Sequence, residues 1–385
     1  MSLKNQFIQS KLQHVTTSIF SVMSGLAIKE NAINLSQGFP DFESDITLIK
    51  LVNNAMINGK NQYAPMPGIF SLRSAIAEKM GHLYNTSYNP ETEITITAGA
   101  TQAIFTVIAA TIKKGDEVLI FKPAYDSYEP TIELFGGKTI AVQLNPEDFK
   151  IDWQIVKSLI TEKTKMLIIN TPHNPSGRVL SKQDMLQLEG ILKDTNILLL
   201  SDEVYEHIIF DGEKHQSAAL FPALRERTFI TASFGKTFHN TGWKVGYCLA
   251  PKELMNEFRK VHQFNVFSVN HPTQVALAEY LKSPNNYLEL GNFYQQKRDL
   301  FLSLIKDSKF EFIPSKGTYF QLLNFKNITS ESDYDFAIRL TKEQKIASIP
   351  ISVFNQNNLD TKVLRFCFAK TDVTLKQAAD ILCAI

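Results

Sequence analysis

Between about residues 94 and 250 the chain alternates short apolar runs with amphipathic stretches of helix length, such as 101–112 and 181–194. Strand–helix–strand repetition predicts a mostly parallel sheet with helices on both faces, because each parallel connection crosses over one face of the sheet. We therefore expect a large α/β domain built on a seven-stranded sheet. The seven runs are EITITAG (93–99), DEVLIF (116–121), TIAVQL (139–144), KMLIIN (165–170), ILLLSDE (197–203), TFITASF (228–234) and GYCLA (246–250).

After about residue 251 the pattern changes to a long helical region (252–307), two short strands (316–325 and 362–370) and a terminal helix. This order predicts a smaller α+β domain, joined in space by the first forty or so residues. A chain of 385 residues is long enough for two such units. The predicted boundaries are 42–280 for the large domain, and 1–41 together with 281–385 for the N-terminal segment and small domain.

Composition excludes several classes of protein. The net charge of +1 offers no electrostatic reason to bind nucleic acid or an anionic membrane surface. Three scattered cysteines, without a C-x-x-C pair, argue against disulfides or structural zinc, and no histidine pair has metal-ligand spacing on a helix. With no signal-peptide pattern and no run of eighteen apolar residues, we expect a cytoplasmic protein without a metal or a membrane span.

Polar residues cluster where the predicted strands end, which is where open parallel sheets bind ligands. The small residues Ala100 and Thr101 follow the first strand and open a helix, so their backbone N–H groups could bind a phosphate or simply cap the helix. Asn174 follows the fourth strand, where turn formation is the alternative reading. The fifth strand ends in Asp202 and Glu203, and two carboxylates capping a buried run favour a functional role for at least one.

The sixth strand ends at Ser233 and is followed by Gly235-Lys236-Thr237. Gly-Lys-Thr invites a nucleotide-binding interpretation, but a P-loop needs another glycine five residues earlier, and that position is Ile230. A G-x-G-x-x-G fingerprint is also absent, which argues against a nicotinamide enzyme. A lysine at a strand end, a distant carboxylate, a tyrosine and a phosphate cradle together are what pyridoxal phosphate requires.

These residues also carry a family resemblance. The order Asn174-Pro175, Asp202-x-x-Tyr205, Ser233-x-x-Lys236 and GWKVG (242–246) resembles the class I/II pyridoxal-phosphate aminotransferases over essentially the whole chain. FGKTFHNTGWKVGY (234–247) and KPAYDSYEP (122–130) are most similar to the methionine and kynurenine/glutamine branch. The resemblance implies the fold of type I pyridoxal-phosphate-dependent transferases and a homodimer.

The resemblance also assigns roles. Lys236 would form an imine with the cofactor, Asp202 would face the pyridine nitrogen, and Asn174 and Tyr205 would contact the phenolic oxygen. Arg365 would bind the substrate α-carboxylate, beside Gly38 and Asn174, since its planar fork matches a carboxylate. Many members have arginine where this chain has Lys244, although the branch named above commonly has lysine. The remaining implied contacts are Tyr125 stacked on the ring, Ser233, Lys244, Ala100 and Thr101 on the phosphate, and Tyr63 from a second subunit.

Several of these residues have plain structural alternatives. Arg365 could form a salt bridge, Tyr125 and Tyr63 could be packing aromatics, and Phe20 either lines the substrate pocket or belongs to the core.

The activity implied is ping-pong transamination from a neutral amino acid (methionine, an aromatic amino acid or glutamine) to a 2-oxo acid. Two alternatives stay open: a β-lyase acting on cysteine S-conjugates, and a regulator that binds the cofactor without turnover.

Overall fold

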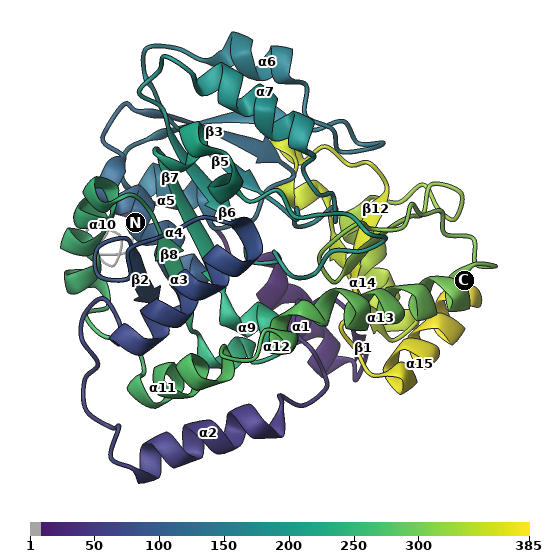
Figure 1. The fold of residues 1–385 in the computed structure, drawn as a ribbon. Coiled ribbons are helices and arrows are strands. Elements are labelled where there is room, and N and C mark those ends of the chain that lie inside the picture. The colour runs from purple at the N-terminus through teal and green to yellow at the C-terminus, as the bar shows by residue number, and fades with distance from the viewer. Residues whose placement is uncertain (1–8) are drawn as a thin grey trace.

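The computed structural model describes residues 9–385, so the first eight residues of the predicted N-terminal segment lie outside the described part. At its centre is a seven-stranded sheet in the order β2-β8-β7-β6-β5-β3-β4 (Figure 1). All seven predicted strands are present, and only β8 runs antiparallel to its neighbours, which confirms a mostly parallel sheet. The strands are β2 (Ile94–Thr97), β3 (Glu117–Lys122), β4 (Lys138–Gln143), β5 (Thr164–Asn170), β6 (Leu198–Asp202), β7 (Thr228–Ser233) and β8 (Gly246–Leu249).

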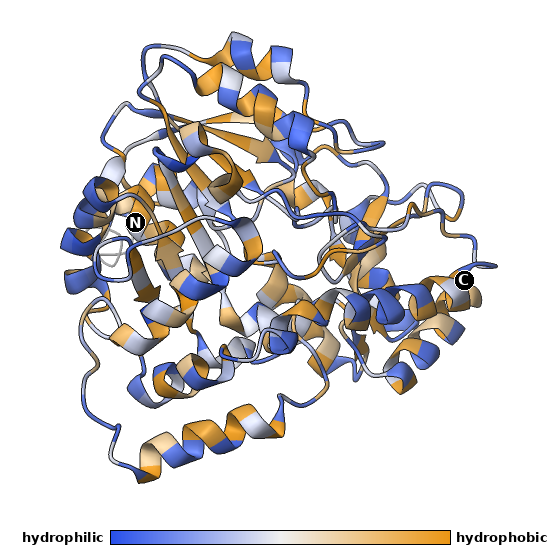
Figure 2. Ribbon diagram, viewed as in Figure 1, coloured by the Kyte–Doolittle hydropathy of each residue, from blue (hydrophilic) through white to orange (hydrophobic). Residues whose placement is uncertain are grey.

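Helices cover both faces of this sheet. Because side chains alternate along a strand, Val118 and Ile120 of β3 belong to one core and Leu119 and Phe121 to the other. The central strands are accordingly mostly hydrophobic, whereas the surface helices carry hydrophobic and hydrophilic residues on different sides (Figure 2). The first core is closed by α4 (Gly99–Thr111), α5 (Tyr128–Leu134) and α10 (Lys252–Asn265), and the second by α3 (Phe70–Tyr84), α6 (Trp153–Leu159) and α7 (Lys182–Leu192).

The predicted helical region 252–307 is divided into four helices: α10, α11 (His271–Tyr280), α12 (Asn285–Leu288) and α13 (Leu290–Ile305). Asn270 starts α11 by accepting a hydrogen bond from the Thr273 backbone N–H, with Pro272 in the first turn. A proline fits a helix start but cannot continue a helix, so these residues interrupt the apolar pattern. Helix α2 (Ile46–Ile57) packs against α11 at the edge of the molecule (Figure 1).

The C-terminal part contains a three-stranded antiparallel sheet, β11-β12-β9, with both predicted strands in it. The N-terminal segment joins it, because β1 (Ile33–Asn34) pairs with β10 (Ile346–Ala347) and α1 (Ile19–Lys29) packs on α14. The predicted domain boundaries themselves stay a prediction. The other elements here are β9 (Phe320–Asn324), α14 (Asp333–Glu343), β11 (Ile349–Pro350), β12 (Val363–Cys367) and α15 (Asp372–Cys383).

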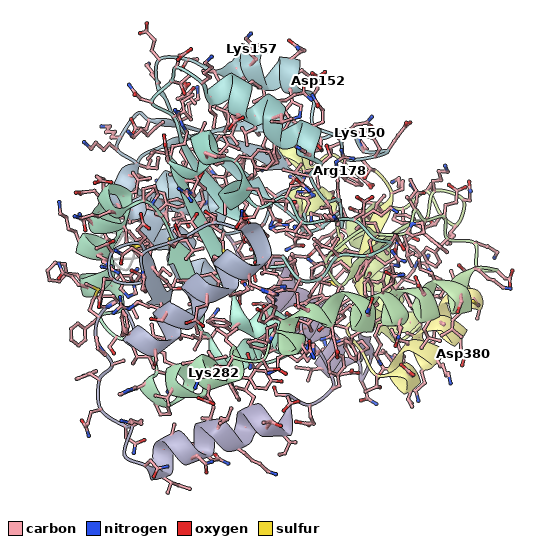
Figure 3. The ribbon with its side chains drawn as sticks, viewed as in Figure 1. Lys150, Asp152, Lys157, Arg178, Lys282 and Asp380 are labelled. Atoms are coloured by element: carbon pink, nitrogen blue, oxygen red, sulfur yellow. The ribbon has the colours of Figure 1, made fainter. Side chains whose placement is uncertain are left out.

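Charged side chains gather at the periphery, where Lys157 and Asp380 point outward from α6 and α15, and Lys282 from the turn after α11 (Figure 3). None of the helices within residues 9–385 combines the length and the apolar character needed to cross a membrane.

Candidate active site

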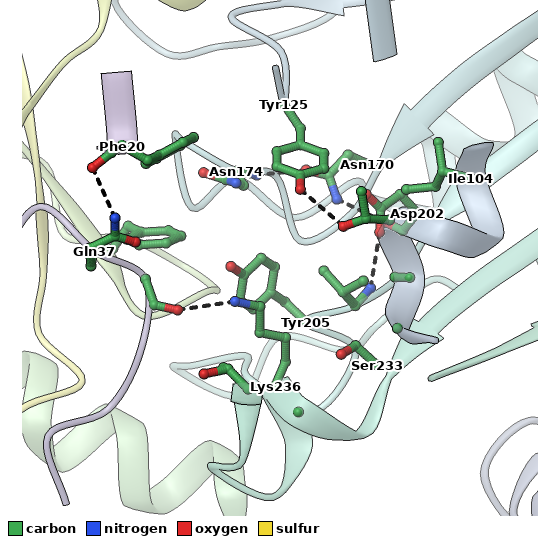
Figure 4. A pocket seen from close by; sticks show the side chains of 18 of the residues that line it. Phe20, Gln37, Ile104, Tyr125, Asn170, Asn174, Asp202, Tyr205, Ser233 and Lys236 are labelled. Carbon is green, nitrogen blue, oxygen red and sulfur yellow. Dashed lines mark hydrogen bonds between the residues drawn. The ribbon is translucent and has the colours of Figure 1, made fainter. Parts of the chain in front are cut away.

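A cavity of about 270 Å³ lies at the ends of the central strands. Two parts of the chain enclose it: the strand-end loops of the large sheet, and the N-terminal segment with the C-terminal sheet (Figure 4). Every predicted site residue except Tyr63 lines this cavity, although these residues are spread over more than three hundred positions of sequence. They are Phe20, Gly38, Ala100, Thr101, Tyr125, Asn174, Asp202, Tyr205, Ser233, Lys236, Lys244 and Arg365.

Lys236 enters the cavity from the short helix α9 (Phe234–Thr237), directly after β7. Its Nζ donates hydrogen bonds to the Gly38 carbonyl oxygen at 3.0 Å and to the Tyr319 hydroxyl at 2.9 Å. Burial lowers the pKa of this lysine to about 8, because the protein around it excludes the water that would stabilise the charged ammonium. A lysine with such a pKa is partly neutral near pH 7 and can act as a nucleophile or a base.

Asp202 ends β6 and is 3% exposed. Its Oδ2 accepts a hydrogen bond from the Tyr128 hydroxyl of α5 at 2.5 Å. Burial raises the pKa of Asp202 to about 6, and the Tyr128 hydrogen bond only partly opposes that rise. A buried carboxylate of this kind would be stabilised by a cationic N–H group placed beside it.

Glu203 points the opposite way from Asp202, as expected for consecutive residues at the end of a strand. Its carboxylate is held by the Ser201 hydroxyl at 2.7 Å, the His215 ring at 2.8 Å and the Ala218 backbone N–H at 3.0 Å. Of the two carboxylates noted in the sequence, only Asp202 reaches the cavity.

Arg365 lies on β12 and is 1% exposed. One terminal nitrogen donates to Asn174 Oδ1 at 2.8 Å and the other to the Ser36 carbonyl oxygen at 3.1 Å. The guanidinium lies between the rings of Phe320 and Phe20, at 3.9 Å and 5.1 Å from their centres. Its buried Nε has no hydrogen-bond partner within the described residues. The side-chain and backbone acceptors of the guanidinium within residues 9–385 are an amide and a carbonyl rather than a carboxylate, and each terminal nitrogen keeps a second N–H for a ligand carboxylate.

The opposite end of the cavity is suited to an anion. Within the described part of the chain no side chain caps the start of α4, so the first backbone N–H groups of this helix have no side-chain acceptor there. Gly99 has a φ of +78°, and a Cβ there would lie 3.3 Å from Lys244 Nζ, so glycine lets that ammonium approach the helix start. Thr101 and Ser233 add hydroxyl groups, and the Thr101 hydroxyl lies 3.1 Å from the Tyr125 hydroxyl. Helix dipole, uncapped N–H groups and a lysine together fit a phosphate.

Tyr63 lies apart from the cavity and is 81% exposed. Its ring packs edge-on against Phe267, with ring centres 5.4 Å apart. Its predicted contribution to the site of a second subunit stays a prediction.

Other residues at the site were not predicted from the sequence. Gln37, Asn170 and Phe320 line the cavity, and Tyr128 and Tyr319 stand behind it, bonded to Asp202 and Lys236. Two of them had a local signal: Asn170 ends a predicted strand, and Tyr128 lies within KPAYDSYEP. Tyr319 had none, since only the tertiary fold brings it to Lys236.

Comparison with known proteins relates nearly the whole chain to aminotransferases. Residues 30–382 match the family described as aminotransferase class I and II. Methionine aminotransferase of Escherichia coli is 46% identical, with 97% of each chain covered, and its crystal structure superposes with a TM-score of 0.96 over 98% of this chain and 99% of that one. Human kynurenine–oxoglutarate transaminase 3 is 33% identical, covering 99% of this chain and 91% of that one.

A third similar protein is named for a different substrate. The N-succinyldiaminopimelate aminotransferase structure from Mycobacterium tuberculosis has a TM-score of 0.94 at 34% identity, over 98% of this chain and 99% of that one. Matches of this extent confirm the predicted fold type and family. The chain is an aminotransferase and belongs to the aminotransferase class I and II family.

Proposed function

We propose that this chain transfers the α-amino group of a neutral amino acid (methionine, an aromatic amino acid or glutamine) to a 2-oxo acid, using pyridoxal phosphate bound at Lys236. The observation that carries this proposal is one cavity containing a lysine with a lowered pKa, a buried carboxylate at another wall and an arginine that has no carboxylate partner within residues 9–385. The class I and II family uses this cofactor, and the anion-binding end at Gly99 and Lys244 fits its phosphate.

Bound pyridoxal phosphate supplies an electron sink for the electrons left when a substrate C–H bond breaks. In this proposal Asp202 holds the proton on the pyridine nitrogen, and Asn174 and Tyr205 bind the phenolic oxygen. Tyr125 packs against the ring. Lys236 Nζ would take the proton from the substrate Cα and hold it as an ammonium beside the cofactor.

Arg365 binds the substrate α-carboxylate and so orients the Cα–H bond. Phe20, Ile104, Tyr125 and Phe320 supply apolar surface to the cavity. Within the described residues, the cationic side chains that line it are Lys236, Lys244 and Arg365, and all three already have roles. The absence of a further cation for a side-chain carboxylate supports a neutral donor, as do the names of the Escherichia coli and human relatives.

We further propose a homodimer in which Tyr63 reaches the partner's site. Tyr63 lies on a surface that also exposes large apolar side chains, as is usual for subunit interfaces: Met56, Ile57, Phe70, Phe264 and Phe267. The expected cytoplasmic location stays a prediction.

The test is an absorbance spectrum of the purified protein before and after adding methionine, with no acceptor present. We expect a visible band that falls while a near-ultraviolet band rises, and a smaller response to aspartate. Lys236→Ala should lose the band and reduce turnover by roughly 10⁴-fold.

Other outcomes would revise the proposal. The absence of a visible band after incubation with pyridoxal phosphate would refute the cofactor assignment. Release of pyruvate and ammonia from a cysteine S-conjugate, without any 2-oxo acid, would identify β-lyase activity.

A further inference from the structure

Tyr319 accepts a hydrogen bond from Lys236 through its hydroxyl oxygen. Its hydroxyl lies 2.9 Å from Lys236 Nζ and 2.5 Å from the Gly38 carbonyl oxygen, and that oxygen is 3.0 Å from the same Nζ. The three polar atoms therefore form a closed triangle at the cavity wall. Tyr319 itself is fully buried.

The protons of this triangle can be assigned from its chemistry. A carbonyl oxygen only accepts, so the single O–H of Tyr319 donates to Gly38 and the tyrosine oxygen accepts from Lys236. Lys236 then donates one N–H to each oxygen. A neutral primary amine has two N–H bonds and one lone pair, so both N–H bonds are occupied and the lone pair is left free. Burial raises the pKa of Tyr319 well above its usual range, which keeps its hydroxyl protonated.

Backbone hydrogen bonds and ring packing hold Tyr319 in this position. The Tyr319 carbonyl accepts from the Phe368 N–H at 3.0 Å, and the preceding Thr318 N–H donates to Ile208 at 2.9 Å. The Tyr319 ring packs edge-on against Tyr205 with ring centres 5.2 Å apart. Gly38 lies against the Phe320 ring with no room for a side chain, because a Cβ there would lie only 2.8 Å from that ring.

The Gly38 segment also connects the lysine to the carboxylate-binding arginine. Two residues earlier, the Ser36 carbonyl accepts from Arg365 at 3.1 Å. Between them, the Gln37 side chain donates to the Phe20 carbonyl at 3.0 Å and to the Ser24 hydroxyl at 2.6 Å. One short segment thus holds Arg365, helix α1 and the amine of Lys236.

We infer that Tyr319 is a positioning residue for Lys236: with the Gly38 carbonyl it holds both N–H bonds of the free amine and leaves the lone pair available to take the substrate proton. This inference rests on the proposed role of Lys236 as the base. The proton taken from Cα becomes the third N–H of the ammonium, and the electrons of the broken C–H bond stay with the substrate carbon.

The test compares Tyr319→Phe with Tyr294→Phe. Tyr294 is a matched control, because it is also fully buried, its ring centre lies 5.6 Å from that of Tyr319, and its hydroxyl bonds His239 instead of Lys236. In the loaded enzyme we expect Tyr319→Phe to lower kcat about tenfold, with KM for methionine within twofold. Tyr294→Phe should keep kcat near the wild-type value.

A second readout needs no turnover. The full-length chain is stripped of cofactor, and the rate at which it captures added pyridoxal phosphate is followed by visible absorbance across pH. The Tyr319 oxygen binds an ammonium more strongly than a neutral amine. Its loss should therefore lower the pKa of Lys236, and the pH at which the capture rate is half-maximal should fall by roughly half a unit. Tyr294→Phe should leave the midpoint unchanged. If Tyr319→Phe does not fold, 3-fluorotyrosine at position 319 keeps the hydroxyl as a weaker acceptor and should give a smaller shift in the same direction.

Unchanged kcat and midpoint in Tyr319→Phe would overturn the inference, and so would equal losses in Tyr319→Phe and Tyr294→Phe. Failure of the wild-type chain to capture the cofactor would instead refute the proposed function. The two failures are therefore distinguishable.

Discussion

Two lysines of this protein, Lys79 in the core and Lys236 in the cavity, have opposite surroundings. Lys79 of α3 is bonded to the Glu206 carboxylate at 2.5 Å and to the Tyr247 hydroxyl at 2.7 Å, within the core on the face of the sheet opposite Asp202. Lys236 has no carboxylate among its hydrogen-bond partners in residues 9–385, only a carbonyl and a hydroxyl. A fully paired lysine joins elements of the fold, whereas one with neutral partners keeps its reactivity.

The carboxylates of the two regions differ in the same way. Burial alone would raise the pKa of Glu206, but the charge and hydrogen bond of Lys79 hold it far below its usual range. Burial raises the pKa of Asp202 to about 6, because its hydrogen-bond partner Tyr128 is neutral. The core therefore holds an ion pair, whereas the cavity holds a carboxylate without a cationic hydrogen-bond partner among residues 9–385.

The largest expected effect comes from breaking the ion pair in the core. Lys79→Met leaves Glu206 buried without its cation and should lower the free energy of unfolding by about 3–5 kcal/mol. Urea unfolding of the cofactor-free chain at pH 7 measures this loss. The double variant Lys79→Met/Glu206→Met should recover much of it, because an apolar pair leaves no charge unpaired. A loss below about 1 kcal/mol in the single variant would mean that Glu206 finds another partner.

A smaller effect should appear in the pH dependence of stability. Asp202 titrates near pH 6 when folded and near 4 when unfolded, so the folded state binds the extra proton between these values. Stability from this group is therefore present below pH 4 and is lost as pH rises through 6, by about 3 kcal/mol. In cofactor-free Asp202→Asn this decline should be absent, which unfolding at pH 4 and pH 7 would test. Equal declines in both proteins would show that the Asp202 pKa is not raised.

The smallest of these effects concerns Arg365. Arg365→Lys keeps the charge but loses the planar fork held between Phe20 and Phe320. KM for methionine should rise about tenfold, equivalent to roughly 1.4 kcal/mol, with a smaller change in kcat. Steady-state kinetics with a fixed 2-oxo acid measures both values. A KM within twofold of wild type would indicate that the guanidinium does not bind the substrate carboxylate.

The sheet could be predicted because its signals are local. Most of the seven strands are largely apolar, since both faces of the sheet are buried at its centre. The polar residues at the strand ends marked the cavity. The motifs around Lys236, Asp202 and Asn174 are contiguous in sequence, so the family resemblance followed from them directly. The antiparallel direction of β8 had no such signal, because an apolar run looks the same in either direction.

The sequence by itself therefore determined the strands, the family and most of the residues that line the cavity. Tertiary structure alone decided which of two adjacent carboxylates faces the cavity, which tyrosines stand behind Lys236 and Asp202, and that Lys79 meets Glu206. These contacts join residues 74 to 127 positions apart, in pairs such as Tyr128 with Asp202, Lys236 with Tyr319 and Lys79 with Glu206. A hydrogen bond depends on distances of a few ångströms, and across such separations only the packed fold sets them.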